Sequence, residues 1–261
     1  MPPAVCWKWI SLDREHELDE RWAGVSAADE AALEIALTLS DEVTVVCLGP
    51  SEADDVLRGA LAAGATSALR IDASTELDGR TVATAIAEHL GGVDLIVCGD
   101  YSLDRGTGSV PAFLAAELGV AQALGLVEIA PGSVPLRVVR RLDGGRREIL
   151  DVTLPAVISV EGSVANLRRA PLAASLAVRS TTIPSVPGPH GRLPDTEIHP
   201  YRPRPRTLPA PSGNSLSRVR DILHVGGNDA HAETITLEPA AAARRLLDQL
   251  EEWGYLDGSP H

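Results

Sequence analysis

The sequence predicts an α/β fold built on an open, mostly parallel, Rossmann-like sheet with helices on both faces. Short β-rich runs alternate with longer runs of helical periodicity across residues 4–130, which is typical of repeated strand–helix–strand units. Two of these runs, 43–48 and 95–98, are almost wholly apolar, as strands covered on both faces are. The chain has 261 residues, 44% of them hydrophobic, which is enough to bury a large core.

Strands and helices take turns within this region. The predicted strands are residues 4–12, 42–48, 67–71, 94–99 and 123–129. The predicted helices are residues 26–40, 52–64, 79–90 and 107–118. Gly64 follows the last apolar turn of the second helix, where a glycine commonly ends a helix. Because parallel strands need crossover helices of this kind, we expect most of these strands to pair in parallel.

A small hairpin extension is predicted after residue 130. Residues 134–142 and 148–154 flank the sequence DGG at 143–145, which favours a tight turn between antiparallel strands. Residues 155–160 are apolar enough to add one more strand, whereas residues 161–185 show no regular pattern.

The C-terminal part of the chain differs in composition from the sheet region. Residues 184–213 are rich in proline and contain several arginines, which favours an extended arm over a packed core. Residues 239–255 have the pattern of an amphipathic helix. We therefore predict a nucleotide-binding α/β domain at 1–183, and an arm with a terminal helix for partner contact at 184–261. The alternative is that the terminal helix folds back on the sheet.

Charge and composition restrict the class of protein. The formal charge is −13 at pH 7, which disfavours binding to nucleic acids and anionic membranes. No apolar run approaches the roughly 20 residues that span a bilayer, and the first residues do not resemble a secretory signal. We therefore expect a cytoplasmic protein without membrane insertion. Cys6, Cys47 and Cys98 lie in apolar runs, which predicts three buried free thiols.

One loop stands out as a candidate ligand site. Residues 104–111, with the sequence DRGTGSVP, join the fourth predicted strand to the fourth helix. Gly106 and Gly108 allow a ligand to approach the backbone, Thr107 and Ser109 offer hydroxyl groups, and the following helix presents free N–H groups. These features suit a phosphate, although an ordinary glycine-rich turn has the same composition.

A second candidate is Lys8, near the carboxyl end of the first strand. Its ammonium group could meet a phosphate or a carboxylate there, or it could lie in solvent at the strand end. The sequence shows no nucleophile–base motif, no pair of carboxylates that a mechanism requires and no standard metal-ligand spacing. We therefore predict no catalytic residue and no metal ligand, and a protein that is not itself an enzyme.

Five segments, in order and spacing, resemble the beta subunit family of electron transfer flavoproteins. They are SAADEAALEIAL at 26–37, VVCLGP at 45–50, LRGALAAGA at 57–65, DLIVCG at 94–99 with the following LD and TG pairs, and LPAVISV at 154–160. The similarity extends over residues 4–180 and includes a plausible C-terminal arm. It implies an electron-carrier subunit that passes electrons from a flavin- or peptide-cofactor-dependent dehydrogenase to an acceptor.

The resemblance also implies a set of cofactors and contacts. A partner alpha subunit would carry most of an FAD site, and the chain itself would hold AMP, or a second FAD in electron-bifurcating members. Matching positions place the cofactor against Cys6, Ser26, Ala27, Ala28, Asp29, Leu48, Asp104, Arg105, Gly106, Thr107, Gly108 and Ser109. Leu172 occupies the place of the family's docking leucine, which dehydrogenase partners grip.

Several positions depart from the family pattern. The usual Asn-Pro pair is Ser26-Ala27, the usual glutamine after Thr-Gly is Ser109, and Asp100 replaces a lysine. Asp100 and Asp104 place two acids beside the proposed phosphate site, where like charges oppose anion binding. These departures fit a divergent branch, such as the one associated with the peptide cofactor mycofactocin. The alternatives are a degenerate scaffold subunit without nucleotide and a stand-alone module of the universal-stress-protein type.

Overall fold

The structure is a computed structural model, in which residues 2–11, 23–132, 135–191, 214–216, 219 and 235–253 are described. The chain divides into two compact units, Met1–Ile198 and His199–His261. The first unit holds the sheet and is described first, and the second holds the C-terminal helix.

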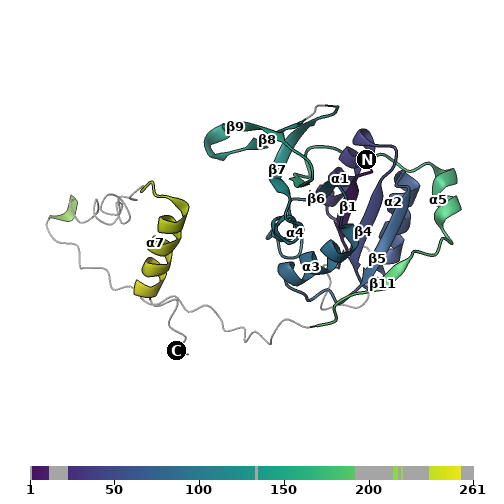
Figure 1. The fold of residues 1–261 in the computed structure, drawn as a ribbon, viewed down its shortest axis with the longest axis horizontal. Coiled ribbons are helices and arrows are strands. Elements are labelled where there is room, and N and C mark those ends of the chain that lie inside the picture. The colour runs from purple at the N-terminus through teal and green to yellow at the C-terminus, as the bar shows by residue number, and fades with distance from the viewer. Residues whose placement is uncertain are drawn as a thin grey trace. The chain divides into compact units, whose positions relative to one another are not determined.

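A nine-stranded sheet forms the centre of the first unit (Figure 1). Its strand order is β11-β5-β4-β1-β6-β10-β7-β8-β9. The strands are β1 Ala4–Lys8, β4 Thr44–Gly49, β5 Ser67–Asp72, β6 Leu95–Gly99, β7 Ala121–Ala130, β8 Leu136–Arg141, β9 Arg147–Val152, β10 Ala156–Val160 and β11 Ser185–Pro187. Pairing is parallel from β11 to β7, and β7, β8 and β9 pair antiparallel. The prediction of an open, mostly parallel sheet is therefore confirmed.

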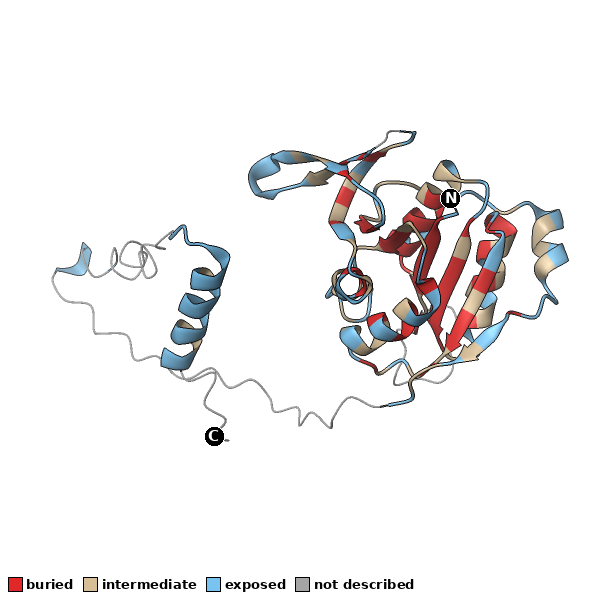
Figure 2. Ribbon diagram, viewed as in Figure 1, coloured by how far each residue is buried: buried red, intermediate tan, exposed pale blue. Residues whose placement is uncertain are grey.

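Helices cover both faces of the parallel part of the sheet. They are α1 Ala27–Leu39, α2 Ala53–Ala63, α3 Gly79–Leu90 and α4 Val110–Leu118. Val5 and Trp7 of β1 pack in one apolar cluster with residues of α1 and α2, while Ala4 and Cys6 pack in a second cluster with residues of α3 and α4. Because successive strand residues point to opposite faces, both faces of β1 are buried (Figure 2). This double burial accounts for the continuous apolar runs in the sequence.

The three cysteines are free and buried, as predicted. Cys6 on β1 and Cys98 on β6 are partners across neighbouring parallel strands. Burial in apolar surroundings raises the pKa of the Cys47 thiol to about 12. A thiol with such a pKa stays protonated at neutral pH, so Cys47 contributes packing rather than nucleophilic chemistry.

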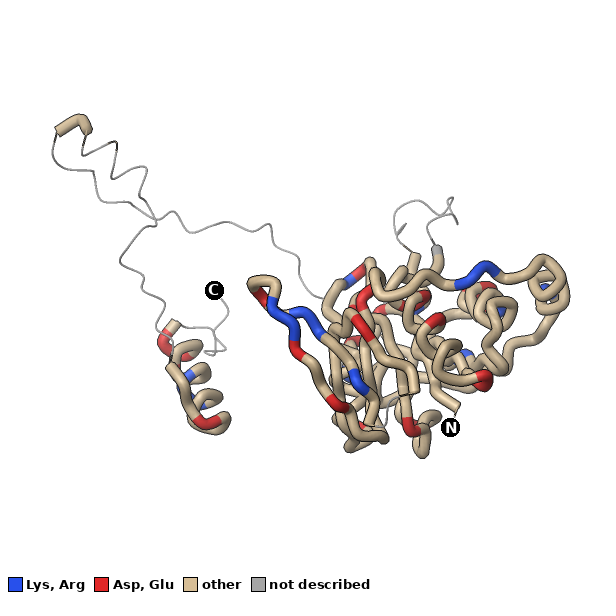
Figure 3. Tube along the Cα trace, turned by 90° about the horizontal axis from the view of Figure 1, so that it is seen from above, with Lys and Arg blue, Asp and Glu red and all other residues tan. Residues whose placement is uncertain are grey.

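The hairpin extension forms as the sequence predicts. Gly144 and Gly145 both have positive φ at the turn, and the backbone N–H of Leu142 donates to the carbonyl of Arg146 over 2.8 Å. The charged residues of β8 are all arginines, and those of β9 include Glu148 and Asp151, which pair with arginines of β8 (Figure 3). Arg137, for example, pairs with Asp151 across the two strands. These charges point outward along a sheet edge, where they disfavour pairing with a foreign strand.

The largest differences from the sequence prediction concern four places in the chain. The first strand ends at Lys8, and Ile10–Ser11 (β2) pairs instead with Ala23–Gly24 (β3) in a separate ribbon. The fourth helix begins at Val110, three residues late. Within the segment predicted to be irregular, Leu172–Val178 forms a short helix, α5. In the predicted arm, Ser185–Pro187 pairs with β5 at the sheet edge, so the first compact unit continues past 183. Such short elements bury too few residues to give a periodic signal.

In the second unit, the predicted amphipathic helix is α7, Pro239–Glu252. It has no buried residue; its Leu246 and Leu247 side chains, and that of Trp253 directly after the helix, are more than half exposed. Residues 254–255 of the predicted helix, and most of the predicted arm, lie outside the described residues. In the described part of the chain, no helix combines the length and apolar character that crossing a membrane requires.

Candidate functional site

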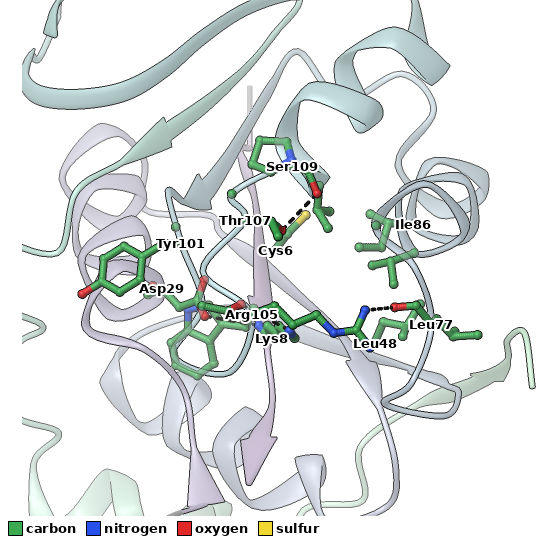
Figure 4. A pocket seen from close by; sticks show the side chains of 18 of the residues that line it. Cys6, Lys8, Asp29, Leu48, Leu77, Ile86, Tyr101, Arg105, Thr107 and Ser109 are labelled. Atoms are coloured by element: carbon green, nitrogen blue, oxygen red, sulfur yellow. Dashed lines mark hydrogen bonds between the residues drawn. The ribbon is translucent and has the colours of Figure 1, made fainter. Parts of the chain in front are cut away.

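A pocket opens at the carboxyl ends of β1, β4 and β6, beside the N-termini of α3 and α4 (Figure 4). In the sheet β1 lies between β4 and β6, so the strand order reverses at this point. Open α/β sheets bind ligands at such a switch point, because the loops on either side of it diverge and leave a crevice. The fold therefore places the pocket where a ligand is expected.

Seven of the residues predicted to bind the cofactor line the pocket. They are Cys6, Asp29, Leu48, Arg105, Thr107, Gly108 and Ser109. Ser26, Ala27, Ala28, Asp104 and Gly106 lie next to these residues in the chain but are not part of the lining. Leu172 starts helix α5 and is 75% exposed. The pocket thus brings seven of the twelve predicted cofactor positions together, and contact of any of them with a ligand stays a prediction.

Sequence reasoning missed two parts of the lining. Trp7 and Trp9 flank Lys8 on the strand side, and Tyr101 follows β6. The other part is the loop between β5 and α3, from which Ser74, Thr75 and Leu77 reach the pocket. The sequence signal that could have indicated this loop is the pair Ser74 and Thr75 after the third predicted strand, followed by Asp78 at the start of a helix.

The loop after β6 is shaped by glycines with positive φ. Gly108 has φ +56°, and a Cβ on it would lie only 2.1 Å from the backbone oxygen of Asp100. Gly106 has φ +63°, and its N–H donates to the Ser102 carbonyl over 2.9 Å. The loop thus folds back on its own backbone, and Gly108 is required for that fold rather than for general flexibility.

Helix α4 follows this loop, and its N-terminus lies at the pocket without a side-chain cap. Ser109 precedes the helix but makes no side-chain capping bond, and its hydroxyl instead lies 3.2 Å from that of Thr107. Pro111, in the first turn, has no N–H to satisfy. The remaining N–H groups and the positive end of the helix dipole favour an anion at this position.

Lys8 is held by the loop after β6. Its Nζ donates to both carboxylate oxygens of Asp104, over 2.6 and 2.7 Å, and to the hydroxyl of Ser102 over 3.2 Å. Partial burial raises the pKa of Asp104, but the hydrogen bonds from Lys8 and Ser102 and the lysine charge outweigh burial and lower it. Asp104 is therefore ionised at neutral pH and offsets the charge of Lys8.

Arg105 is the cation that remains for a ligand. Its Nη1 donates to the backbone oxygen of Leu77 over 2.6 Å, across the pocket from the loop before α3 (Figure 4). Among the described residues, no carboxylate forms an ion pair with this guanidinium. A guanidinium carries five N–H donors in a planar fork, so one bond to Leu77 leaves donors for a phosphate.

The two acids that opposed a phosphate on sequence grounds lie outside the lining. Asp104 is paired with Lys8, and Asp100 turns toward the end of β10. Burial and the nearby Glu161 carboxylate raise the pKa of Asp100, and its Oδ1 is buried without a hydrogen-bond partner. These two carboxylates therefore repel an anion in the pocket less than the sequence alone indicated.

Asp29 forms the inner end of the pocket at the start of α1. Burial raises the pKa of this carboxyl to about 7, against hydrogen bonds from Ser26 and from the backbone N–H groups of Lys8 and Gly99. The indole N–H of Trp7 donates to the Asp29 backbone oxygen over 2.7 Å. A Cβ on Gly99 would lie 2.6 Å from Oδ1 and 2.9 Å from the backbone nitrogen of Asp29, so the end of β6 packs closely against the start of α1.

The pocket combines an apolar part with one anion-binding edge. Cys6 and Leu48 suit a planar ring, while Arg105 and the α4 N-terminus suit a phosphate. Within the described residues, no group of three or more His, Cys, Asp or Glu side chains is placed to hold a metal ion. The guanidinium of Arg105 and the uncapped start of α4, beside the apolar lining, form a donor set that fits a nucleotide.

Known proteins resemble this chain over the same region. A family profile described as the electron transfer flavoprotein domain matches residues 18–188. The chain is 34% identical over 148 residues to the electron transfer flavoprotein subunit beta of Syntrophomonas wolfei, which covers 53% of this chain and 58% of that protein. It is 33% identical over 168 residues to the protein FixA of Azorhizobium caulinodans, covering 58% and 59%.

The electron transfer flavoprotein subunit beta of Mycobacterium tuberculosis is also similar, with 33% identity over 166 residues that cover 59% of this chain and 62% of that protein. The chain thus spans about three fifths of the length of the curated relatives it matches. The profile match begins after β1 and includes the rest of the nine-stranded sheet, the pocket loops after β5 and β6, and α5.

Proposed function

Because this chain belongs to the electron transfer flavoprotein family, as a member of beta type, we propose that it is an electron-carrier subunit that works with an FAD-binding alpha subunit. The complex would pass electrons from a flavin- or peptide-cofactor-dependent dehydrogenase to an acceptor. The observation that carries the proposal is the pocket at the strand-order reversal, whose donor set fits a nucleotide. The flavin would supply the redox chemistry, and this chain would hold and orient cofactor groups.

The proposed ligand of the pocket is AMP. Arg105, Thr107 and Ser109 would hold its phosphate, and Cys6 and Leu48 would lie against its base. The fit rests on the guanidinium without an ionic partner among the described residues and on the uncapped start of α4. FAD would be shared with the alpha subunit.

Chromatography of the groups released by heat from the chain copurified with its alpha subunit tests this proposal. We expect one FAD and one AMP for each heterodimer. FAD without AMP would instead support a scaffold subunit that has lost its nucleotide, and two FAD would place the second flavin in the pocket. Absence of flavin would contradict the electron-carrier function.

Two exposed apolar surfaces suit two different partners. Leu172 and Leu176, one helical turn apart on α5, are 75% and 60% exposed, and we assign Leu172 to docking of the dehydrogenase. The exposed leucines of α7, within the predicted arm domain 184–261, would instead contact the alpha subunit.

The two assignments are tested together, each variant acting as the control for the other. Leu172→Glu is expected to slow flavin reduction by the dehydrogenase at least tenfold without loss of the heterodimer, because a buried anchor carries about 2 kcal/mol or more. Deletion of residues 236–261 is expected to release the alpha subunit in gel filtration. An intact heterodimer after the deletion, or an unchanged reduction rate with Leu172→Glu, would contradict the corresponding assignment.

A further inference from the structure

The loop between β5 and α3 contacts two parts of the molecule. It forms one wall of the pocket, and it also holds residues 187–191, which we call the strap. In sequence the strap connects β11 with the C-terminal unit, His199–His261. We propose that Arg105 couples occupancy of the pocket by an anionic nucleotide to seating of the strap. The coupling rests on the proposed function, since it requires a ligand in that pocket.

Two hydrogen bonds hold the strap against the end of β5 and the loop that follows it. The N–H of Gly188 donates to the Asp72 carbonyl over 2.9 Å, and the Ser74 hydroxyl donates to the Gly191 carbonyl over 2.5 Å. The fit is close, because a Cβ on Gly188 would lie 2.5 Å from the Ile71 side chain and 2.9 Å from the Asp72 oxygen. The strap therefore cannot shift without breaking contacts to the end of β5 and the loop after it.

The same loop is tied to the pocket by Arg105. Ser74 and Leu77 line the pocket, and Leu77 accepts the 2.6 Å hydrogen bond from Arg105. Leu77 also lies beside the strap, since a Cβ added at Gly191 would lie 3.5 Å from its Cδ2. The loop thus bonds to Arg105 through the Leu77 carbonyl and to the strap through the Ser74 hydroxyl.

A phosphate bound to the free donors of Arg105 would fix the guanidinium, and through it the Leu77 carbonyl. A fixed loop holds the strap better than a mobile one, so the two events favour each other. Thermodynamic linkage requires this effect to be reciprocal, so loosening the strap must weaken nucleotide binding by the same factor. A bound nucleotide would in this way stabilise the position of the strap, which leads in sequence to the C-terminal unit.

Hydrogen exchange of the full chain, with AMP and FAD as separate probes, tests the first half of the coupling. Pro187 and Pro189 have no amide hydrogen, so the strap amides to follow are those of Gly188, His190 and Gly191. We expect a saturating probe to slow exchange both in residues 100–109 and at these strap amides. Protection of 100–109 without any change in the strap would overturn the coupling and leave the proposed site intact. Absence of protection at 100–109 with both probes would overturn the site and the coupling together.

The substitution Gly188→Ala tests the reciprocal half, because Gly188 does not line the nucleotide pocket. Its Cβ would displace the strap, and we expect the Kd for the protective probe to rise about fivefold, the lower end of typical coupling between sites. The matched control is Gly59→Ala on α2, where a Cβ would meet nothing within 4 Å. Circular dichroism should show both variants folded. Equal Kd values in the two variants would overturn the coupling.

Discussion

Replacing Gly108 by alanine is expected to abolish nucleotide binding and to destabilise the protein by about 3 kcal/mol or more. The added Cβ would lie 2.1 Å from the Asp100 backbone oxygen, at a φ of +56° that alanine adopts only with strain. A backbone atom cannot yield as a flexible side chain does, so the loop after β6 must change its path. That change would displace Thr107, Ser109 and the start of α4, which form the anion-binding edge.

Gly106→Ala provides the matched control for this prediction. Gly106 has φ +63°, but the nearest atom to a Cβ there is 3.9 Å away, so this variant has the strain without the clash. It is expected to cost about 1–2 kcal/mol and to keep most of the affinity for AMP. Urea unfolding and isothermal titration measure the two effects. If both variants behaved alike, the close approach of Gly108 to Asp100 would not control the site.

The order of the strands and helices could be predicted because burial on both faces leaves apolar runs in the sequence. Runs such as Thr44–Gly49 keep their strand character regardless of distant partners. Helix α5 and strand β11 could not be predicted, because each is short. α5 has no buried residue, and β11 depends on pairing with Arg70, Ile71 and Asp72 more than a hundred residues earlier.

The same distinction applies to the site. The loop around Gly108 was identified from local composition, since glycines and hydroxyl residues before a helix have a local structural meaning. The pairing of Lys8 with Asp104 joins residues 96 positions apart, and the bond from Arg105 to Leu77 joins residues 28 apart. Neither pair has a signal in the sequence. For that reason Asp104 was expected to repel a phosphate, whereas in the structure it forms an ion pair with Lys8.

Asp29 is expected to make the protein less stable as pH rises from about 4 to about 7. Burial raises its folded-state pKa to about 7 from the ordinary value of 3.8, so the native state favours the neutral carboxyl. A raised folded-state pKa contributes stability below the unfolded pKa, and that contribution is lost as pH rises through the folded pKa. By linkage, a shift of about three pKa units corresponds to a loss on the order of 4 kcal/mol.

Asp29→Asn isolates this effect, because asparagine has nearly the same shape and does not ionise. The variant gains stability relative to the native protein as pH rises from 4.5 to 8, whatever constant offset the amide introduces. Urea unfolding at several pH values measures the difference. The control is Asp78→Asn, because hydrogen bonds from Thr81 and Arg80 at the start of α3 lower the pKa of Asp78. A lowered folded-state pKa contributes stability above the unfolded-state pKa. The difference in unfolding free energy between Asp78→Asn and the native protein should therefore change with pH only in the acid range. A pH-independent difference for Asp29→Asn would show that Asp29 is ionised in the folded protein without cost.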